Sequence, residues 1–142
     1  MAITKDTPIM YIDDDNDDVE IFRHVLAALN FSHPIISFWN GKEALLYLQS
    51  EKINPFLIFC DINMPVMNGF ELREEISKDP KLNLACIPFL FYSTSAEKKY
   101  VDKAYELTVQ GYFKKLSNDA EIKEQLKRII DYWRDCKHPK NC

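Results

Sequence analysis

The sequence predicts an α/β fold: a doubly wound sheet of five parallel strands with helices on both faces. Apolar runs of about five residues recur along the chain, as is typical of strands buried on both faces of a parallel sheet. Segments with helical periodicity separate the runs, which favours right-handed crossovers between parallel strands. The length of 142 residues suits one domain. We therefore expect five strand-helix units in a single domain.

The expected strands are short and mostly apolar. Proline opens the first four runs, at a strand position where a sheet tolerates the missing N–H, and glycine opens the fifth. Each run is therefore expected to begin at its Pro or Gly. The runs are PIMYI at 8–12, PIISFW at 34–39, PFLIFC at 55–60, PFLFYS at 88–93 and GYF at 111–113.

The segments between the runs predict helices. Apolar residues recur three or four positions apart within 19–29 and within 122–133, so each of these segments has one apolar face. Capping-box spacing, in which a cap residue precedes an acidic residue by three positions, marks the expected helix starts. The pairs are Asn40 with Glu43, Thr94 with Glu97, and Asn118 with Glu121.

Composition and charge exclude several classes of function. The formal net charge of −4 provides no attraction for nucleic acid. No apolar stretch reaches the roughly 18 residues of a membrane span, and the N-terminus lacks a signal-peptide pattern. The three glycines form no nucleotide-binding loop, and the four cysteines contain no CxxC pair. We therefore expect a cytoplasmic protein that contacts neither nucleic acid nor membrane directly.

Polar residues follow the expected strands where each strand ends. Ligands of open α/β sheets collect beyond the carboxyl ends of the strands, so these residues are expected to converge on one site. They are Asp13 and Asp14 after the first strand, Asp61 after the third, Ser93 at the end of the fourth, and Lys115 after the fifth.

Clustered carboxylates need a counter-ion. Mg²⁺ prefers oxygen ligands and usually takes one or two carboxylates together with phosphoryl oxygens, which suits Asp14 and Asp61. A carboxylate held beside such a cation can attack phosphorus and form an aspartyl phosphate. Lys115 would help to neutralise charge on the transferring group. The residues alone therefore indicate a site for magnesium-dependent phosphoryl transfer.

Four segments, YIDDD, CDINMPVMNGFEL, PFLFYST and GYFKKL, resemble the signature of the response-regulator receiver domain. This domain is the phosphoacceptor module of two-component signalling. The resemblance covers about residues 7–135, and 61–69 is its most specific part. It implies a flavodoxin-like, CheY-like sheet with strand order 2-1-3-4-5. It also implies one receiver domain over 1–142, with its core at about 7–135 and a polar tail at 136–142.

The resemblance implies roles for the acidic residues. Asp61 resembles the phosphoacceptor that takes the phosphoryl group. Asp14, Asp61 and the backbone carbonyl of Asn63 are similar to the family's Mg²⁺ ligands. Asp13 is similar to the acid that reaches the metal through a water molecule. The expected cofactor is therefore Mg²⁺.

The resemblance also implies roles for the other strand ends. Ser93 and Lys115 resemble the hydroxyl and the lysine that contact the phosphoryl group, and the family spacing favours Lys115 over Lys114. Tyr112 resembles the aromatic switch residue, although a simply packed aromatic is an equally good interpretation. The residues near the site that could tune phosphoryl access or lifetime are Thr94, Ser95 and Leu116.

The implied function is that of a stand-alone response regulator and not of a separate enzyme. A sensor histidine kinase or a phosphotransfer protein would donate a phosphoryl group to Asp61 in a Mg²⁺-dependent reaction, and water would remove it. Phosphorylation would then bias a two-state surface toward an unidentified downstream protein. The family places this surface on its fourth helix, fifth strand and fifth helix, around 96–107, 111–114 and 119–135.

Departures from the family pattern keep a different function open. Leu116 stands where the family usually has a cis-proline, and Thr94 is bulkier than the usual small residue. Thr108 stands where a glycine is common. A phosphorylation-independent interaction module is therefore one alternative.

The acidic residues after the first strand have further interpretations. Asp17, Asp18 and Glu20 are expected to favour the positive end of a helix dipole, and Asp15 is either a helix cap or a contact for a metal-bound water. Asp13-x-Asp15 also resembles the acid pair of haloacid-dehalogenase phosphatases. That class expects a hydroxyl where Asp17 stands and usually a cap domain, so it is the weaker alternative.

Overall fold

The computed structural model describes residues 6–50 and 54–137. Within these ranges the chain forms a parallel sheet of five strands in the order β2-β1-β3-β4-β5, together with six helices. The expected fold class and strand order are confirmed. The strands are β1 (Ile9–Ile12), β2 (Ile35–Phe38), β3 (Leu57–Cys60), β4 (Phe89–Ser93) and β5 (Gly111–Lys114). The helices are α1 (Asn16–Ala28), α2 (Gly41–Ser50), α3 (Gly69–Lys78), α4 (Pro80–Ala85), α5 (Lys98–Glu106) and α6 (Asp119–Asp135).

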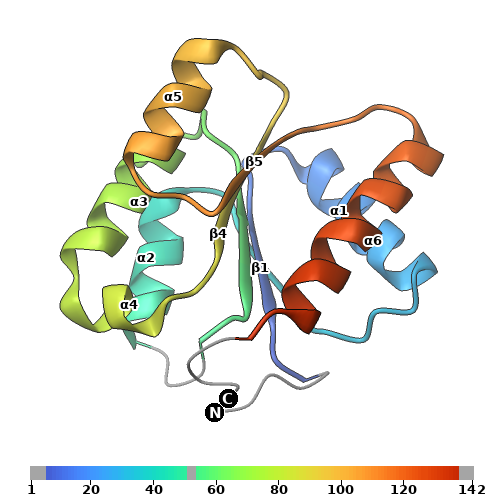
Figure 1. Ribbon diagram of the computed structural model, residues 1–142, viewed down its shortest axis with the longest axis horizontal. Helices are drawn as coiled ribbons and strands as arrows, with labels where there is room; N and C mark the ends of the chain where they lie inside the picture. Colours follow the sequence, from blue (N-terminus) through green and yellow to red (C-terminus); the bar gives the residue numbers. More distant parts are fainter. Residues whose placement is uncertain (1–5, 51–53, 138–142) are drawn as a thin grey trace.

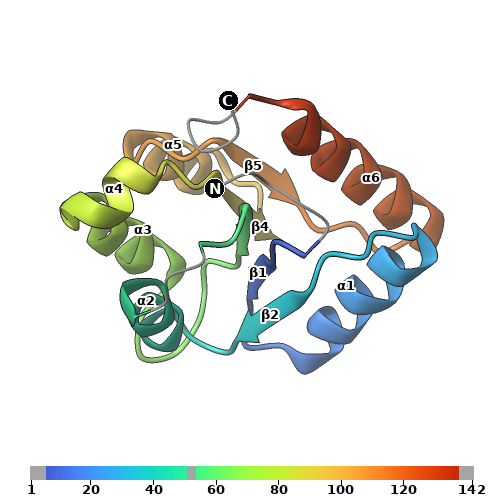
Figure 2. The ribbon, with the colours of Figure 1, turned by 90° about the horizontal axis from the view of Figure 1, so that it is seen from below.

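The sheet is the middle layer of three. Figure 1 shows the sheet between α1 and α6 on one side and α2, α3, α4 and α5 on the other. Figure 2 shows the same layers from below. The central strand register places Ile9 opposite both Ile35 and Leu57. Because the strands are parallel, their carboxyl ends lie at one edge of the sheet, where a ligand site is expected.

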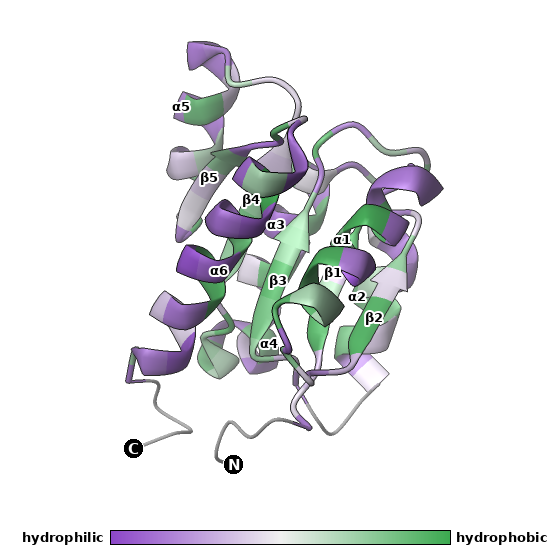
Figure 3. Cartoon of the chain, turned by 90° about the vertical axis from the view of Figure 1, so that its right-hand side faces the viewer, coloured by the Kyte–Doolittle hydropathy of each residue, from purple (hydrophilic) through white to green (hydrophobic). Residues whose placement is uncertain are grey.

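Successive residues of each strand face opposite layers, as the pleat requires. Met10 and Ile12 pack with the helices α2 to α5, whereas Ile9 and Tyr11 pack with α1 and α6. Each of these residues is at most 1% exposed. Figure 3 shows the apolar strands in the centre and polar residues on the outer helix surfaces. Burial on both faces thus explains the apolar residues of the inner strands β1, β3 and β4, whereas the edge strands β2 and β5 are less completely buried.

Two of the three expected helix N-cap residues are confirmed. Asn40 and Asn118 each accept a hydrogen bond from the backbone N–H three residues later, at 2.9 and 3.2 Å. The third expectation is wrong, because α5 begins at Lys98 and Glu97 is its N-cap residue. Thr94 instead belongs to a loop between β4 and α5, so it caps no helix.

A short helix that periodicity did not predict, α4, lies between α3 and β4. Its six residues are too few to show an apolar stripe. Local signals nevertheless define it, because Asp79 accepts hydrogen bonds from two backbone N–H groups and Pro80 occupies the first turn. A complete capping box between Asn68 and Glu71, also not expected, begins α3. The crossover from β3 to β4 therefore carries two helices where one was expected.

The apolar stripe of the last helix packs as expected. Ile122, Leu126 and Ile130 are buried, and α6 ends at Asp135. Residues 138–142 of the expected polar tail lie outside the described residues. None of the described helices is long and apolar enough to cross a membrane.

Candidate functional site

Backbone hydrogen bonds continue the sheet past the ends of β1 and β3. The Asp13 N–H donates to the Phe38 carbonyl at 3.0 Å, and the Asp61 N–H donates to the Ile12 carbonyl at 2.8 Å. These bonds hold both aspartates at the same edge of the sheet. The sequence places an acidic residue after each of two neighbouring strands, and the strand order brings the two together.

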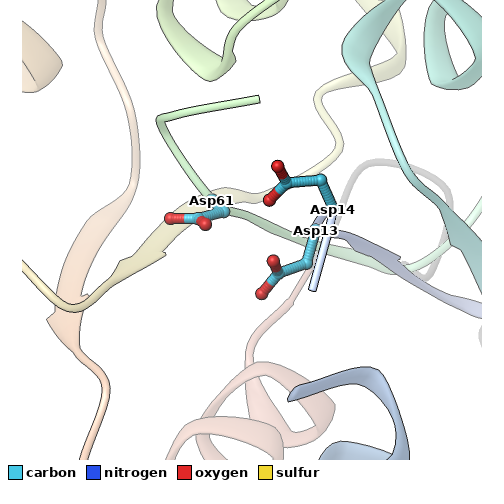
Figure 4. Close-up of side chains that lie close together, drawn as sticks. All are labelled: Asp13, Asp14 and Asp61. Atoms are coloured by element: carbon cyan, nitrogen blue, oxygen red, sulfur yellow. The ribbon is translucent and has the colours of Figure 1, made fainter. Parts of the chain in front are cut away.

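Three carboxylates converge at this edge, as Figure 4 shows. Asp13, Asp14 and Asp61 each offer a carboxylate oxygen, and these oxygens lie within 4.8 Å of one another. Asp13 is buried, Asp61 is half-buried and Asp14 is exposed. The Asp14 carboxylate forms no hydrogen bond or ion pair with the described residues. Like charges at this distance repel, so the cluster needs cations to offset its charge.

Lys115 supplies one such cation. Its N–H donates to the Ser93 carbonyl at 2.7 Å, which fixes the backbone just beyond β5. Its Nζ lies 2.6 Å from Asp13 Oδ2, 2.8 Å from Asp18 Oδ2 and 3.5 Å from Asp61 Oδ2. The Lys115 side chain is 9% exposed, whereas the neighbouring Lys114 is exposed. The geometry therefore places Lys115 and not Lys114 at the acidic cluster.

The carboxylates set the protonation of Lys115. Burial lowers the pKa of the Lys115 ammonium, but hydrogen bonds to Asp13 and Asp18 and the charge of Asp61 raise it by more. The net pKa lies above the ordinary lysine value. Lys115 therefore stays charged at neutral pH.

Both oxygens of Asp13 are occupied by protein donors. Oδ2 accepts hydrogen bonds from Lys115 Nζ and from the Tyr11 hydroxyl at 3.1 Å, and Oδ1 accepts from the Asp15 N–H at 3.0 Å. The Asp15 carboxylate in turn accepts from the N–H groups of Asp17 and Asp18, so Asp15 is the N-cap of α1. An Asp13 held in this way suits an indirect contact with a cation better than a direct one.

The surroundings of Asp61 alter the protonation of its carboxylate. Burial raises its pKa, the charge of Lys115 lowers it and the charge of Asp13 raises it, with a net pKa of about 6. Asp61 Oδ1 also accepts a hydrogen bond from the Ile62 N–H at 2.8 Å. Without a bound cation, ionising Asp61 therefore costs more free energy in the folded protein than in the unfolded chain.

Ser93 and Tyr112 lie on the neighbouring strands. Ser93 is 2% exposed, and its Oγ accepts a hydrogen bond from the Ser95 N–H at 3.3 Å. The Tyr112 hydroxyl donates to the Ser95 carbonyl at 2.5 Å. Burial raises the pKa of Tyr112, and a hydrogen bond with Ser93 partly offsets this. Tyr112 thus links β5 to the loop after β4, while Thr94 in that loop is exposed.

The remaining expected site residues lie in loops at the same edge. Asn63 is exposed, two residues after Asp61, and its role as a carbonyl ligand stays a prediction. No cis peptide bond occurs among the described residues, so the Lys115–Leu116 bond is trans. Leu116 is half-buried and packs against the core between the sheet and the helices α1 and α6. It is therefore part of the hydrophobic core.

Gly69 shows why the loop after Asp61 has a glycine at its end. The Gly69 N–H donates to the Ile62 carbonyl at 2.9 Å. A Cβ at this position would lie 2.3 Å from the Asp61 carbonyl oxygen and 2.8 Å from the Phe91 ring. Only a residue without a side chain fits, so the start of α3 packs directly on the backbone of Asp61.

Sequence reasoning missed two residues of this site. Tyr11 lies in the first apolar run, and the sequence gives no local signal that its hydroxyl contacts Asp13. Asp18 lies in the first turn of α1, as its helix-dipole interpretation expects, but it also forms an ion pair with Lys115 that this interpretation does not include. The two members of that pair are 97 residues apart, so no local pattern could reveal it.

The family model described as the response regulator receiver domain matches residues 9–127. The chain belongs to this family. Receiver domains are components of two-component signalling, in which histidine kinases phosphorylate them and downstream targets bind them. Membership in this family gives no support to the haloacid-dehalogenase alternative.

Individual relatives resemble this receiver domain over most of its length. Response regulator Rcp1 of Synechocystis sp. is 28% identical over 130 residues, which cover 88% of this chain and 87% of that protein. The phosphorylated cyanobacterial phytochrome response regulator RcpA has a crystal structure with a TM-score of 0.85 and 28% identity, covering 94% of this chain and 99% of the other. The manganese-bound form of Rcp1 has a TM-score of 0.80 and 27% identity, covering 93% and 97%.

Proposed function

We propose that this receiver domain accepts a phosphoryl group on Asp61 from a histidine kinase or a phosphotransfer protein, in a reaction that requires Mg²⁺. The observation that carries the proposal is the convergence of Asp13, Asp14 and Asp61 beside Lys115 in a member of the receiver family. A phosphoacceptor needs a nucleophilic oxygen, cations to offset charge, and access for the donor. The three acids and the lysine supply the first two, and the partial exposure of Asp61 supplies the third.

The donor set fits a divalent cation. Carboxylate oxygens are the ligands that Mg²⁺ prefers, and Asp14 is exposed without a partner among the described residues. Asp14, Asp61 and the Asn63 carbonyl would hold the ion, with Asp13 acting through water. Bound Mg²⁺ would neutralise charge on the phosphoryl oxygens during transfer. The manganese-bound relative and the phosphorylated relative support this assignment.

The transfer itself uses the side chains of this chain. An Asp61 carboxylate oxygen attacks phosphorus, the P–N bond to the donor histidine breaks, and its electron pair stays with the imidazole. Lys115, whose Nζ is already 3.5 Å from Asp61, contacts a phosphoryl oxygen. The buried Ser93 hydroxyl donates to another. Attack of water on phosphorus later restores the free carboxylate.

The output surface is proposed on α5, β5 and α6. Tyr112 connects β5 to the loop that carries Ser95, so a shift of Ser93 toward a phosphoryl group would reach Tyr112. Tyr105 on α5 is 52% exposed. A groove of about 490 Å³ lies between β5 and α6 and is lined in part by Phe113 and Trp133. A downstream protein would bind this surface after phosphorylation.

The test is covalent labelling. The wild type is incubated with acetyl phosphate and Mg²⁺, and intact mass is measured beside the variants Asp61→Asn and Asp13→Asn, and beside wild type in excess chelator. A single labile phosphoryl adduct is expected on the wild type, none on Asp61→Asn, and little in chelator. Asp17→Asn is the matched control, since this exposed acid lies outside the cluster.

Two results would contradict the proposal. An adduct that persists in Asp61→Asn and disappears in Asp13→Asn would assign the nucleophile to Asp13. A wild type that takes up no phosphoryl group, either from acetyl phosphate or from a cognate kinase, and does not bind beryllofluoride would favour the phosphorylation-independent interaction module.

A further inference from the structure

Asp18 makes a contact that its place in the sequence does not suggest. It lies in the first turn of α1, and its Oδ2 is 2.8 Å from Lys115 Nζ. The Asp18 side chain is 29% exposed and that of Lys115 is 9% exposed. A small cavity of about 30 Å³ beside the pair is lined mainly by apolar and aromatic side chains, including Leu116. The pair is therefore less screened by water than an ion pair on an exposed helix.

The contacts of the ammonium are unequal. A lysine ammonium has three N–H donors. Short hydrogen bonds to Asp13 at 2.6 Å and Asp18 at 2.8 Å use two of them, and Asp61 lies farther away at 3.5 Å. One donor is thus left without a short bond, on a nitrogen already beside Asp61. A phosphoryl group on Asp61 would bring an acceptor oxygen closer to that donor.

Lys115 needs such anchors because the position of its backbone does not by itself determine where the ammonium lies. Lys115 follows the last residue of β5, and its backbone N–H donates a hydrogen bond to the Ser93 carbonyl. The four-carbon stem is flexible, so the backbone alone does not fix Nζ. Asp13 at the end of β1 and Asp18 on α1 hold the ammonium from two different elements.

We propose that Asp18 is a positioning residue that holds the Lys115 ammonium at Asp61 for contact with the phosphoryl group. This inference rests on the proposed function. Asp18 itself does not touch the reacting atoms and acts through Lys115. A helix-dipole role, which Asp18 shares with Asp17 in the same turn, is a separate and purely structural effect.

The neighbouring Asp17 is a matched control. It is exposed in the same helix turn, carries the same charge and makes no side-chain contact with Lys115. Asp17→Asn and Asp18→Asn therefore remove equal charge from the same helix end. A difference between them reports the contact with Lys115 and not the helix dipole or the general field.

The experiment is a double-mutant cycle on the rate of Mg²⁺-dependent phosphorylation by acetyl phosphate, followed by intact mass. Asp18→Asn is expected to slow phosphorylation about tenfold relative to Asp17→Asn, within the range of coupling between contacting residues. In a Lys115→Met background, Asp18→Asn should cause no further loss. Asp18→Glu should recover part of the rate, because it retains the carboxylate.

Each alternative result overturns the inference in a recognisable way. If Asp18→Asn matches Asp17→Asn, accelerates phosphorylation, or slows the Lys115→Met protein as much as the wild type, Asp18 does not act by positioning Lys115. If the wild type itself is not phosphorylated, the proposed function is wrong, and so is this inference, which rests on it. Circular dichroism and urea unfolding verify that each variant is folded, and Asp18→Glu replaces Asp18→Asn in the cycle if the latter does not fold.

Discussion

At the scale of single residues, the site depends on close contacts that tolerate no added atom. Gly69 is the clearest case, because its backbone lies directly against the Asp61 carbonyl. The position of an acidic side chain at the end of a strand depends on the position of the backbone that carries it. The glycine that begins α3 therefore affects the geometry of Asp61 without contacting its carboxylate.

Gly69→Ala is predicted to destabilise the protein by about 1–3 kcal/mol, the usual cost of overpacking. The new Cβ would lie 2.3 Å from the Asp61 carbonyl oxygen, so the loop after β3 must shift. Urea unfolding measures the loss. Gly111→Ala is the control, because its nearest contact is the Phe113 ring at 3.0 Å, a side chain that can move. Equal losses in the two variants would contradict the argument.

His33 is a second residue whose surroundings have a measurable consequence. It is 6% exposed, its Nδ1 lies 2.8 Å from the Thr7 carbonyl, and its ring centroid is 4.7 Å from that of Phe56. Its Nε2 is buried without a hydrogen-bond partner among the described residues. Burial lowers the pKa of His33, Arg134 lowers it further, and the Thr7 carbonyl and Asp6 act in the opposite direction. The folded protein therefore favours the neutral ring.

The contribution of His33 to the free energy of unfolding is predicted to fall as the pH drops below about 6.5, the ordinary histidine value. The unfolded chain binds a proton there that the folded chain resists, so the loss from this group is at most about 1.4 kcal/mol per pH unit. Urea unfolding of the wild type and of His33→Gln between pH 7 and pH 5 measures this contribution as the difference between the two proteins, because Asp61 changes the total in the opposite direction. His33→Gln should remove this part of the pH dependence. If the free energy of unfolding of that variant changes with pH as much as that of the wild type, the prediction is wrong.

At the scale of elements, a buried arginine joins α3 to the corner between α5 and β5. Arg73 is 8% exposed, and it donates to the Leu107 carbonyl at 3.0 Å and to the Thr108 hydroxyl at 3.1 Å. Thr108 has a φ of 61°, a conformation that favours glycine. Arg73 thus supplies a hydrogen-bond donor to a carbonyl group at the end of α5. It also supports a threonine at a position where the family commonly has glycine.

Arg73→Met is predicted to destabilise the protein by about 1–3 kcal/mol, because carbonyl groups at the end of α5 lose their donor. Thermal and urea unfolding measure the effect. Lys78→Met on the same helix is the control, since the ion pair between Lys78 and Glu74 is exposed and should contribute under about 1 kcal/mol. If both variants lose the same stability, the buried hydrogen bonds of Arg73 do not hold this corner.

At the scale of the whole molecule, the acidic edge of the sheet opposes folding through the charge of Asp61. The pKa of Asp61 is raised to about 6, chiefly by burial, so its ionisation is harder in the folded chain than in the unfolded one. This cost is absent at low pH, where both states are protonated, and is complete above pH 6. The ionised Asp61 carboxylate beside other acids therefore lowers the stability of the fold above this pH.

Two linked effects on stability are predicted at pH 7.5. Without metal, Asp61→Asn should be more stable than the wild type by on the order of 1–2 kcal/mol, because the half-buried charge of Asp61 is removed. Added Mg²⁺ should stabilise the wild type by about 1.4 kcal/mol at ten times its dissociation constant. Thermal unfolding with Mg²⁺ and with chelator measures both. An equal response to Mg²⁺ in Asp61→Asn would contradict binding at this site.

Much of the architecture was predictable because its signals are local. These signals are the apolar runs, a proline before four of the strands, and caps such as Asn118. Each signal lies within a few residues of the element that it defines. The helix α4 was missed because a helix of six residues shows no period. Thr94 was wrongly expected to begin a helix because its spacing from Glu97 fits a capping box equally well in a loop.

The sequence by itself determined the alternation of strands and helices, the acids that follow β1 and β3, and the resemblance to the receiver family. Only the tertiary structure decided which groups share the Lys115 ammonium, and it showed that Asp18 is one of them. Periodicity and caps act between neighbours along the chain, whereas this ion pair joins residues 97 positions apart. Its existence depends on how α1 and the end of β5 pack around the same strand edge.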